Sequence, residues 1–464
     1  MSQLHRRGFL QSTAAGLSLS SLADCVAAAE PVSGPRADHF RIAPFRFDVT
    51  PPMGHSCCGG WIKPIEAVDD SLEAIGYVLL GAGDPIVVCV VDWTGILNSA
   101  HTAWRAALAE AAGTSAERVA VQCVHQHNAP FACLDAERIV AAEGDLPHIV
   151  ELDFFTACLE KARHAVKTAL RNPRTITHVG YGQAKVEQVA SNRRVHVDET
   201  GKIIGMRGSA CTDAKLRDLP EGLIDPFLKT VAFFDGDQKV LACHYYAVHP
   251  MSYYGDGRAS SDFAGLARKR RQDDEPGTTH LYFTGCSGNI AAGKYNDGSK
   301  PMRAVLTQRV YDGIVASESA LQRESIRKIE WRATPILPIP RSQPGVQELK
   351  AAIQNKSNPV VGRNRPAYEL AWHQRIEQKI PVILSSLSIN TVSMIHLPAE
   401  SFIEYQLRAQ QLHPGRFVAT AAYGDGGSWY IPTKEAYPGG GYEVSVAFSE
   451  PMIDDEITGA IRSL

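Results

Sequence analysis

The amino-acid sequence predicts an α/β protein whose core is a mixed β-sheet with flanking helices. Apolar runs occur in pairs around short polar turns, which is typical of β-hairpins. Amphipathic segments with capping residues separate several of these runs, which is typical of helices between strands. Polar side chains directly follow several apolar runs, as they do at the functional edge of α/β sheets.

The first third of the chain shows this alternation. Residues 41–52 form a predicted strand that ends at a double proline, because proline cannot donate to a strand ladder. Residues 75–93 contain two apolar runs around a Gly-Ala-Gly-Asp turn and predict a hairpin. A helix should begin at Asn98 or Ser99 and end at Gly113. An apolar strand, 119–124, follows this helix.

The middle of the chain repeats the pattern. Residues 154–170 predict an amphipathic helix, and residues 227–250 predict a hairpin that turns at an Asp-Gly-Asp sequence. A helix that is capped by Ser261 or Asp262 should follow, and then a strand that leads into a glycine-rich loop. Residues 302–322 again have helical character.

The last third contains one exception. Residues 338–366 hold five prolines and predict an irregular, Pro-rich excursion with one helix, which could line a cleft. An apolar hairpin that turns near Asn390 should follow. The expected closing elements are a helix, a strand and a long loop, which cover 401–411, 416–422 and 423–442.

Composition excludes some classes of function. The 464 residues are 44% hydrophobic and 21% charged, with a formal net charge of −3. This balance is not that of a protein that binds nucleic acid or a polybasic protein that binds membranes. No segment approaches the ~20 consecutive apolar residues of a membrane-spanning helix. We therefore expect no nucleic-acid partner and no transmembrane segment.

The N-terminus has the features of an export signal. Paired arginines at 6–7 precede Gly-Phe-Leu and an apolar, small-residue run that ends in Val-Ala-Ala-Ala. This pattern is typical of a twin-arginine signal, here residues 1–29 with cleavage after Ala29. The mature protein is then expected to be exported to the periplasm or secreted.

Three polar groups follow apolar strands and stand beside proline-bearing turns, and they make a candidate site. They are the His125-x-His127 pair, His249 and Glu400. Because strand ends of an α/β sheet gather at one edge, these side chains should meet. Two or three histidines with one carboxylate are a common set of zinc ligands. For each residue an alternative stays open: His249 as a satisfied core histidine, and Glu400 as a first-turn carboxylate that the helix dipole favours.

The motifs around these residues resemble those of the neutral/alkaline, non-lysosomal ceramidases, in their N-terminal catalytic domain. Each motif is weak alone, but six occur in the family's order over about 390 residues. The resemblance implies a ceramidase-like catalytic domain over residues 38–464, without a counterpart of the family's C-terminal immunoglobulin-like domain. The six motifs are Arg-Phe-Asp-Val-Thr-Pro-Pro, Val-His-Gln-His-Asn-Ala-Pro, Ser-Asn-Arg-Arg-Val, Tyr-Ala-Val-His-Pro-Met-Ser, Leu-Pro-Ala-Glu-Ser-Phe and the block from Trp429 to Glu443.

The resemblance also implies residue roles. One Zn²⁺ per chain would be held by His125, His249, Glu400 and Tyr430. Three further residues would bind or polarise the scissile amide, namely His127, Arg193 and Tyr442. Arg193 is preferred over Arg194 because it directly follows Asn192. The implied activity is hydrolysis of an amide bond in ceramide or another N-acyl, lipid-like substrate by metal-activated water.

The chain departs from the family around the site, and this leaves the substrate open. Ala291 stands where the family has a serine, and Asn289 where it has an aspartate. A serine nucleophile is therefore excluded at that position, whereas the expected zinc ligands are present. Two alternatives to an amidohydrolase remain: an esterase of the same fold, and a cell-envelope ligand-binding protein with a vestigial metal site.

Overall fold

The computed structural model describes residues 40–464, and these residues belong to one compact unit. The predicted export signal, 1–29, lies outside the described residues and stays a prediction. Among residues 40–464, no helix combines the length and the apolar character that crossing a bilayer would require.

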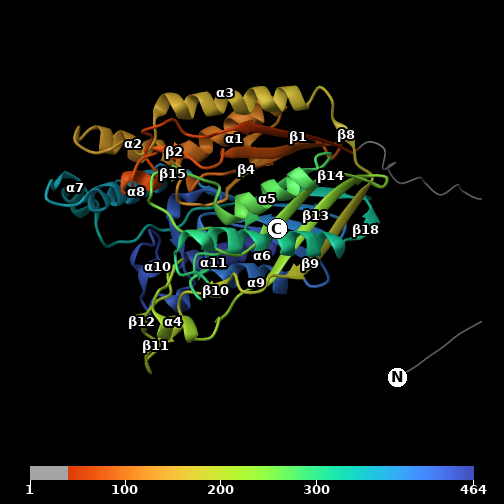
Figure 1. Cartoon of the computed structure of the whole chain (residues 1–464). Helices are drawn as coiled ribbons and strands as arrows, with labels where there is room; N and C mark the ends of the chain where they lie inside the picture. The colour runs from red at the N-terminus through yellow and green to blue at the C-terminus, as the bar shows by residue number, and fades with distance from the viewer. Residues whose placement is uncertain (1–39) are drawn as a thin grey trace, which may run out of the picture. The chain divides into compact units, whose positions relative to one another are not determined.

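The first sheet has five strands in the order β6-β4-β3-β1-β8. β3 pairs antiparallel with both β1 and β4, as the predicted hairpin requires, whereas β4 and β6 are parallel. The helix between them, α1 (Ser99–Ala112), packs with α3 (Leu152–Ala169), and α3 lies along the outer face of β1 (Figure 1). The strands are β1 (Arg41–Asp48), β3 (Glu73–Leu80), β4 (Ile86–Val91), β6 (Val119–Cys123) and β8 (Arg174–Thr175).

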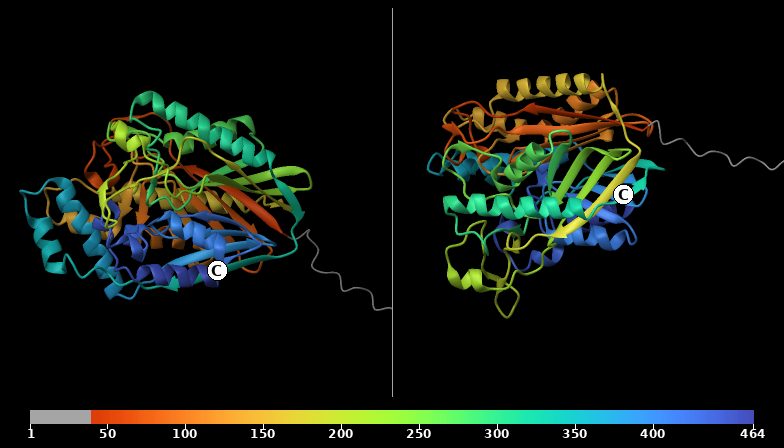
Figure 2. Two further views of the ribbon diagram at one scale, coloured as in Figure 1. Left: turned by 90° about the horizontal axis from the view of Figure 1, so that it is seen from below. Right: turned by 45° about the vertical axis from the view of Figure 1, so that its right-hand side comes forward.

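The second sheet also has five strands, in the order β16-β14-β13-β9-β18. Its hairpin β13–β14 turns at Gly236 as predicted, and β14 and β16 are parallel. α5 (Asp262–Asp274) and α6 (Lys300–Ser319) pack on this sheet, and Figure 2 shows α6 lying across its strands. The strands are β9 (His178–Lys185), β13 (Phe227–Asp235), β14 (Gln238–Tyr246), β16 (Thr279–Thr284) and β18 (Gln322–Ser325).

The third sheet has four strands in the order β19-β20-β21-β23. The hairpin β20–β21 turns at Asn390, and β21 and β23 are parallel. α9 (Ile403–Leu412) contacts β23, and α11 (Ile453–Ser463), which the sequence did not predict, contacts β19. The strands are β19 (Ile329–Ile336), β20 (Val382–Ile389), β21 (Val392–His396) and β23 (Phe417–Ala421).

Alternation along β4 explains how two cores share one sheet. Side chains of successive strand residues point to opposite faces. Ile86, Val88 and Val90 join a core that the second and third sheets also line, and the ring of Tyr77 from β3 lies 5.7 Å from that of Phe233 in β13. The intervening residues join a second core beneath α1 and α3. The predicted α/β class with mixed sheets and flanking helices is therefore confirmed.

Short elements complete the chain around the sheet ends. They include two parallel two-residue pairings, β22 with β24 and β15 with β2, and one antiparallel pairing, β10 with β17. The strands are β2 (Ala67–Val68), β5 (Gly95–Leu97), β7 (Phe131–Cys133), β10 (Ser191–Asn192), β11 (His196–Val197), β12 (Ile203–Gly205), β15 (Arg258–Ala259), β17 (Ile290–Ala291), β22 (Glu400–Ser401) and β24 (Tyr430–Ile431). The short helices are α2 (Leu134–Ala141), α4 (Ala214–Asp218), α10 (Tyr442–Ser445), η2 (Cys58–Gly60), η3 (Ala116–Arg118), η4 (Gly426–Ser428) and η5 (Lys434–Ala436).

The predicted irregular excursion at 338–366 needs correction. It contains α7 (Val346–Gln354) and the start of a long helix, α8 (Val360–Glu377). Pro359 immediately precedes α8, where a proline suits a helix start, and Pro366 is accommodated inside the helix. Four of the five prolines therefore lie outside the two helices and one lies inside α8, so the prolines do not exclude helical structure here. Both helices pack together, and α8 also contacts α2 and η2.

Candidate metal centre

Three edge strands, one from each sheet, end at the same place. The backbone N–H of Cys123, at the end of β6, donates to the carbonyl of Tyr423, 2.8 Å away. The N–H of Ala422 donates to the carbonyl of Thr284, at the end of β16, over 2.9 Å. The hydroxyl of Thr284 in turn donates to the carbonyl of Val124 over 2.7 Å. These bonds bring loops from distant parts of the chain together at one edge.

His125 lies in the loop after β6 rather than in the strand. The strand ends at Cys123, and His125 has φ = 78°, so the two rings of the His-x-His pair do not project alike from a strand. The rings of His125 and His127 are 5.0 Å apart and 80° from parallel. Nδ1 of His125 is 2.6 Å from the carbonyl oxygen of Thr94. Since a carbonyl only accepts, Nδ1 carries a proton, which leaves Nε2 as the ligand atom.

His249 lies three residues after β14, and a backbone carbonyl holds its ring in the same way as that of His125. Its Nδ1 donates to the carbonyl oxygen of Ser287 over 2.6 Å, which leaves Nε2 as the ligand atom. Burial lowers the pKa of this fully buried ring to about 4, although Glu400 acts to raise it. The ring is therefore neutral at physiological pH.

Glu400 is the carboxylate between the two rings. It pairs in parallel with Tyr430 where β22 meets β24, so two distant motifs are fixed side by side. Its Oε2 lies 3.2 Å from Nε2 of His125 and 3.1 Å from Nε2 of His249. Burial opposes ionisation of Glu400, but attraction to the two histidines outweighs it, and the pKa of Glu400 lies well below its ordinary value.

The three ligand atoms fit a divalent cation. They lie within 4.8 Å of one another, and each can present a lone pair to a cation. Nε2 of His125 and Oε2 of Glu400 are buried without a hydrogen-bond partner, despite being 3.2 Å apart. Buried polar atoms are rarely left unpaired, and a cation at their common focus would satisfy both. Two imidazoles and one carboxylate are a donor set that zinc takes in catalytic sites.

Tyr430 and Arg193 lie beside this cluster. The hydroxyl of Tyr430 is 3.4 Å from Nε2 of His249, and Nη1 of Arg193 is 3.3 Å from the same hydroxyl. Burial raises the pKa of Tyr430 well above its ordinary value, Glu400 raises it further, and Arg193 lowers it. Without a cation beside it, the phenol therefore keeps its proton.

The loop that departs from the ceramidase motif positions Arg193. β10 pairs with β17, and the N–H of Arg193 donates to the carbonyl of Asn289 over 2.8 Å. Arg194 takes a different direction, and its Nη1 donates to Glu443 over 2.9 Å. Of the two arginines, it is Arg193 whose guanidinium reaches Tyr430 and lies 5.5 Å from the ring centre of Tyr442.

His127 and Tyr442 face the same space. The ring centre of His127 lies 6.1 Å from that of His249 and 5.2 Å from that of Tyr254. Burial and the two neighbouring histidines lower the pKa of His127, and its buried Nδ1 has no hydrogen-bond partner. Tyr442 packs edge-on against Tyr430 at 5.7 Å and is 41% exposed, so it stands at the mouth. Every residue that the sequence singled out thus lies in one neighbourhood.

Five of these side chains line a cavity of about 290 Å³. The polar side of the cavity contains His125, His127, Glu400, Tyr430 and Tyr442. The opposite side is aromatic and apolar, with rings that pack on one another at centroid distances of 4.8–6.2 Å. The apolar lining residues are Trp61, Ile62, Phe131, Val361 and Trp429.

Sequence reasoning missed Tyr423. Its ring stacks on His125 at 4.2 Å, and its hydroxyl is 2.7 Å from that of Ser287 and 3.3 Å from Nδ1 of His249. Tyr423 therefore contacts both histidines and orients them. A signal was present, because Tyr423 follows an apolar strand just as the predicted residues do.

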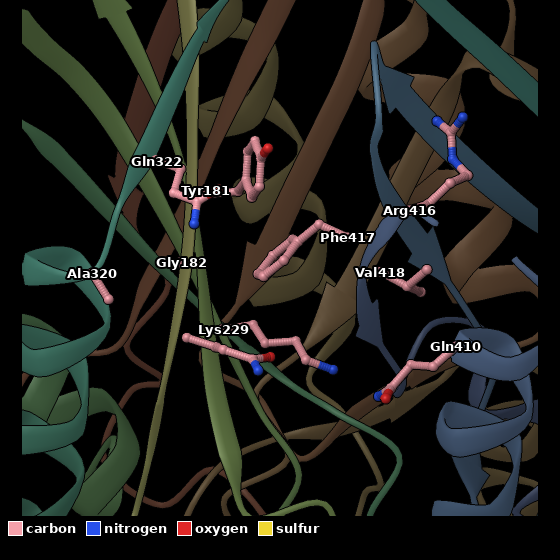
Figure 3. Close-up of a pocket in the computed structure, with 10 residues that line it drawn as sticks. Tyr181, Gly182, Lys229, Ala320, Gln322, Gln410, Arg416, Phe417 and Val418 are labelled. Atoms are coloured by element: carbon pink, nitrogen blue, oxygen red, sulfur yellow. The ribbon is translucent and has the colours of Figure 1, made fainter. Parts of the chain in front are cut away.

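A larger cavity elsewhere lacks this chemistry. Figure 3 shows a space of about 460 Å³ between the second and third sheets, with Tyr181, Lys229 and Arg416 on its walls. Lys229 is already bonded to Asp225, 3.2 Å away, and Arg416 donates to Ser393 over 2.6 Å. None of its lining residues is a histidine, cysteine or carboxylate. We therefore take the smaller cavity as the functional one.

Comparison with known proteins agrees with the fold. No protein-family model and no curated protein sequence matches the chain. The solved structure of a ceramidase complexed with C2 superposes with a TM-score of 0.68, at 14% identity, over 91% of this chain and 74% of that one. The neutral ceramidase from Pseudomonas aeruginosa gives a TM-score of 0.67, at 16% identity, over 91% of this chain and 73% of that one. The chain therefore has a ceramidase-like catalytic fold, and the resemblance is confirmed at that level.

Proposed function

We propose that this protein is a zinc-dependent hydrolase that cleaves an amide bond of an N-acyl, lipid-like substrate, as a ceramidase does. One observation carries the proposal. The ligand atoms of His125, His249 and Glu400 lie within 4.8 Å of one another, at a cavity that His127 and Tyr442 also line. The ceramidase-like fold supports the same class of reaction.

The ligands that we assign to the metal are His125, His249, Glu400 and Tyr430. When bound, zinc lowers the pKa of a water to about 7 and polarises a carbonyl, so that hydroxide is available at neutral pH. The backbone carbonyls of Thr94 and Ser287 hold the two rings in the ligating tautomer. One zinc per chain would bind the ligand atoms of His125, His249 and Glu400, which lie within 4.8 Å of one another.

The chain's own residues would manage charge and protons. Arg193 keeps its charge, because Tyr430 and Glu443 outweigh the effect of burial and raise its pKa. Together with the hydroxyl of Tyr442, it can donate hydrogen bonds to the negative charge that develops on the carbonyl oxygen. His127 is neutral and has a free ring nitrogen, so it can accept a proton and pass it to the leaving amine.

The aromatic wall suits the apolar part of the substrate. Trp61, Phe131 and Trp429 offer a continuous apolar surface opposite the polar residues. An acyl chain beside this wall would leave its carbonyl directed at the ligand cluster. Ceramide and shorter N-acyl compounds share these features.

The test compares an amide and an ester with the same acyl group, before and after removal and restoration of zinc. His127→Ala should retain about one zinc per chain and lose ~10²–10⁴-fold in kcat on the amide, as expected for a general acid–base residue. His164→Ala, an exposed histidine on α3, should change neither.

Two results would replace the proposal. Hydrolysis of the ester alone would make the protein an esterase of the same fold. Full zinc occupancy with no hydrolysis of either compound would favour a ligand-binding protein with a vestigial metal site.

A further inference from the structure

The long helix α8 brings one arginine to the cavity. Val361 and Arg365 of α8 line it, together with the residues described above. Two contacts fix the helix against the site. Nδ2 of Asn364 donates to the carbonyl of Gly59 over 2.8 Å, and the hydroxyl of Tyr368 donates to the carbonyl of Phe131 over 2.6 Å. The position of Arg365 relative to the site is therefore set by the surrounding structure.

Arg365 differs from the other arginines of α8 because no carboxylate in the described part of the chain is hydrogen-bonded to its guanidinium, although it acts against the burial that raises the pKa of Glu369, one turn later on α8. Arg363 binds Asp145 through both terminal nitrogens, at 3.1 and 2.9 Å, and Arg375 binds Asp425 at 2.6 Å. Among residues 40–464, Arg365 makes no hydrogen bond and no ion pair, and its buried Nε lacks an acceptor. Its guanidinium rests near the Trp61 ring, 5.9 Å from the centroid. An aromatic face supports a guanidinium but leaves its donors free.

The charge of the cavity favours an anion. Arg365 is the one cationic side chain among its lining residues, and Glu400 is the one carboxylate. Glu400 already serves the metal cluster, so a divalent cation there would leave the walls with a positive balance. Arg365 also acts on Tyr442, whose pKa burial raises and Arg365 lowers, so the arginine lies close to the proposed oxyanion donors.

We propose that Arg365 binds a carboxylate that the substrate carries next to its amide bond, so that N-acyl amino acids are the preferred substrate class. The planar guanidinium offers two parallel donors to a carboxylate, and the Trp61 side is apolar. The volume of about 290 Å³ is at the lower end of the ~300–1,000 Å³ of small-molecule sites. It encloses the amide, a small charged group and the first carbons of the acyl chain beside the aromatic wall, and the rest of a long acyl chain extends past the exposed rings of Tyr254 and Tyr442.

This inference rests on the proposed function, but binding tests it separately from catalysis. The probes are N-hexanoylglycine and N-hexanoylglycinamide, which differ only in the charge of the terminal group. Calorimetry on the metal-free protein prevents turnover and removes the zinc as an alternative anion site. The same comparison on zinc-loaded His127→Ala, whose turnover is slow, keeps the charge balance of the loaded site. The carboxylate should bind ~10-fold or more tightly than the amide, as a charge-assisted pair provides.

Variants assign this preference to Arg365. Arg365→Gln should abolish the preference, Arg365→Lys should retain part of it, and Arg327→Gln, an exposed arginine with 71% side-chain exposure, should retain all of it. With zinc restored, the kcat/KM ratio of the two probes should follow the same order. If Arg365→Gln does not fold, Arg365→Lys carries the test, because it keeps the charge but loses the planar pair of donors.

Three results would overturn the inference. The first is equal binding of both probes by the wild-type protein, and the second is an equal loss of affinity for both probes in Arg365→Gln. The third is equally tight binding of N-hexanoyltaurine, because its sulfonate would show that the site attracts any anion. Failure to hydrolyse any amide, with the carboxylate preference intact, would instead count against the proposed function alone.

Discussion

Two buried groups of two histidines and one glutamate lie in this fold, and they differ in what surrounds the glutamate. In the first, His125, His249 and Glu400, the carboxylate faces two ring nitrogens, and its Oε2 has no hydrogen-bond partner. The second group consists of His244 in β14, His280 in β16 and Glu318 in α6, with ligand atoms that are also within 4.8 Å of one another.

In the second group, both oxygens of Glu318 and the facing nitrogens of the two histidines already have partners within the protein. Only Nε2 of His280 lacks a hydrogen bond, and Oε2 of Glu275 lies 3.3 Å from it. Oε1 of Glu318 accepts from Nζ of Lys239 at 2.8 Å, and its Oε2 accepts from Nε of Arg271 at 2.5 Å. Nε2 of His244 and Nδ1 of His280 are 3.0 Å apart and share a proton in a hydrogen bond. Residue types therefore do not define a metal site. A metal site is defined by lone pairs that the fold leaves without a partner.

The largest expected effect is the loss of zinc from the first group only. Glu400→Gln removes the carboxylate charge, and zinc should bind more than ~100-fold more weakly, because loss of outer-shell partners alone costs 10–100-fold. Glu318→Gln is the matched control and should retain about one zinc per chain. Metal analysis of both purified variants, each checked for folding by circular dichroism, measures this.

Equal zinc loss from the two variants would break the comparison. It would place a second cation at Glu318, and the lysine and arginine would then have to bind elsewhere. If Glu400→Gln binds zinc as tightly as the wild-type protein does, the proposed metal centre is wrong.

The free energy of unfolding should depend on the second group, in which Glu318 pairs with two cations. Glu318→Gln leaves Lys239 and Arg271 with only Glu275, which lies 2.7 and 2.8 Å from them. Breaking a fully buried pair costs ~3–5 kcal/mol, so we expect a loss of about 2–3 kcal/mol here because one carboxylate remains. Urea unfolding measures this, and Glu66→Gln, in an exposed pair with Lys63, should cost less than ~1 kcal/mol. A loss for Glu318→Gln no larger than that for Glu66→Gln would mean that the second group does not stabilise the fold.

Most elements could be predicted from the sequence because their signals are local. The hairpin turns at Gly236 and Asn390 and the helix end at Gly113 lie where the turn and capping residues place them. The two helices at 338–366 could not both be predicted, because the five prolines there indicated irregular structure with one helix. Four of these prolines lie outside α7 and α8, and Pro366 is accommodated inside α8. What decides the helical state there is packing against α2 and η2, which the local sequence does not reveal.

The candidate site was predictable in its residues but not in its geometry. Strand ends and motif resemblance pointed to His125, His249 and Glu400, and the structure brings them together. The carbonyls of Thr94 and Ser287 that fix the tautomers could not be predicted, because any residue can supply a carbonyl. The free guanidinium of Arg365 likewise depends on which neighbouring arginines find carboxylates, and only the fold decides that.

The smallest expected effect concerns the pH dependence of the second group. Burial lowers the pKa of His244 to about 4 and lowers that of His280 as well, and His244 adds to the effect on His280. The unfolded chain binds a proton on each ring as the pH falls below about 6.5, whereas the folded protein does not. The free energy of unfolding therefore decreases with falling pH, from about 6.5 down to the folded pKa. The charged groups that face these rings are Lys239, Arg268, Arg271, Glu275 and Glu318.

His280→Gln removes one of these protons from the unfolded state. Between pH 6 and pH 5, the slope of the unfolding free energy should then fall by up to about 1.4 kcal/mol per pH unit. His164→Gln, at an exposed position, should leave the slope unchanged. Zinc-loaded protein is used for all three chains, so that His125 and His249 stay bound and do not contribute. Parallel curves for wild type and His280→Gln would show that this ring is protonated in the folded state. The second group would then hold one more positive charge than the contacts described here accommodate.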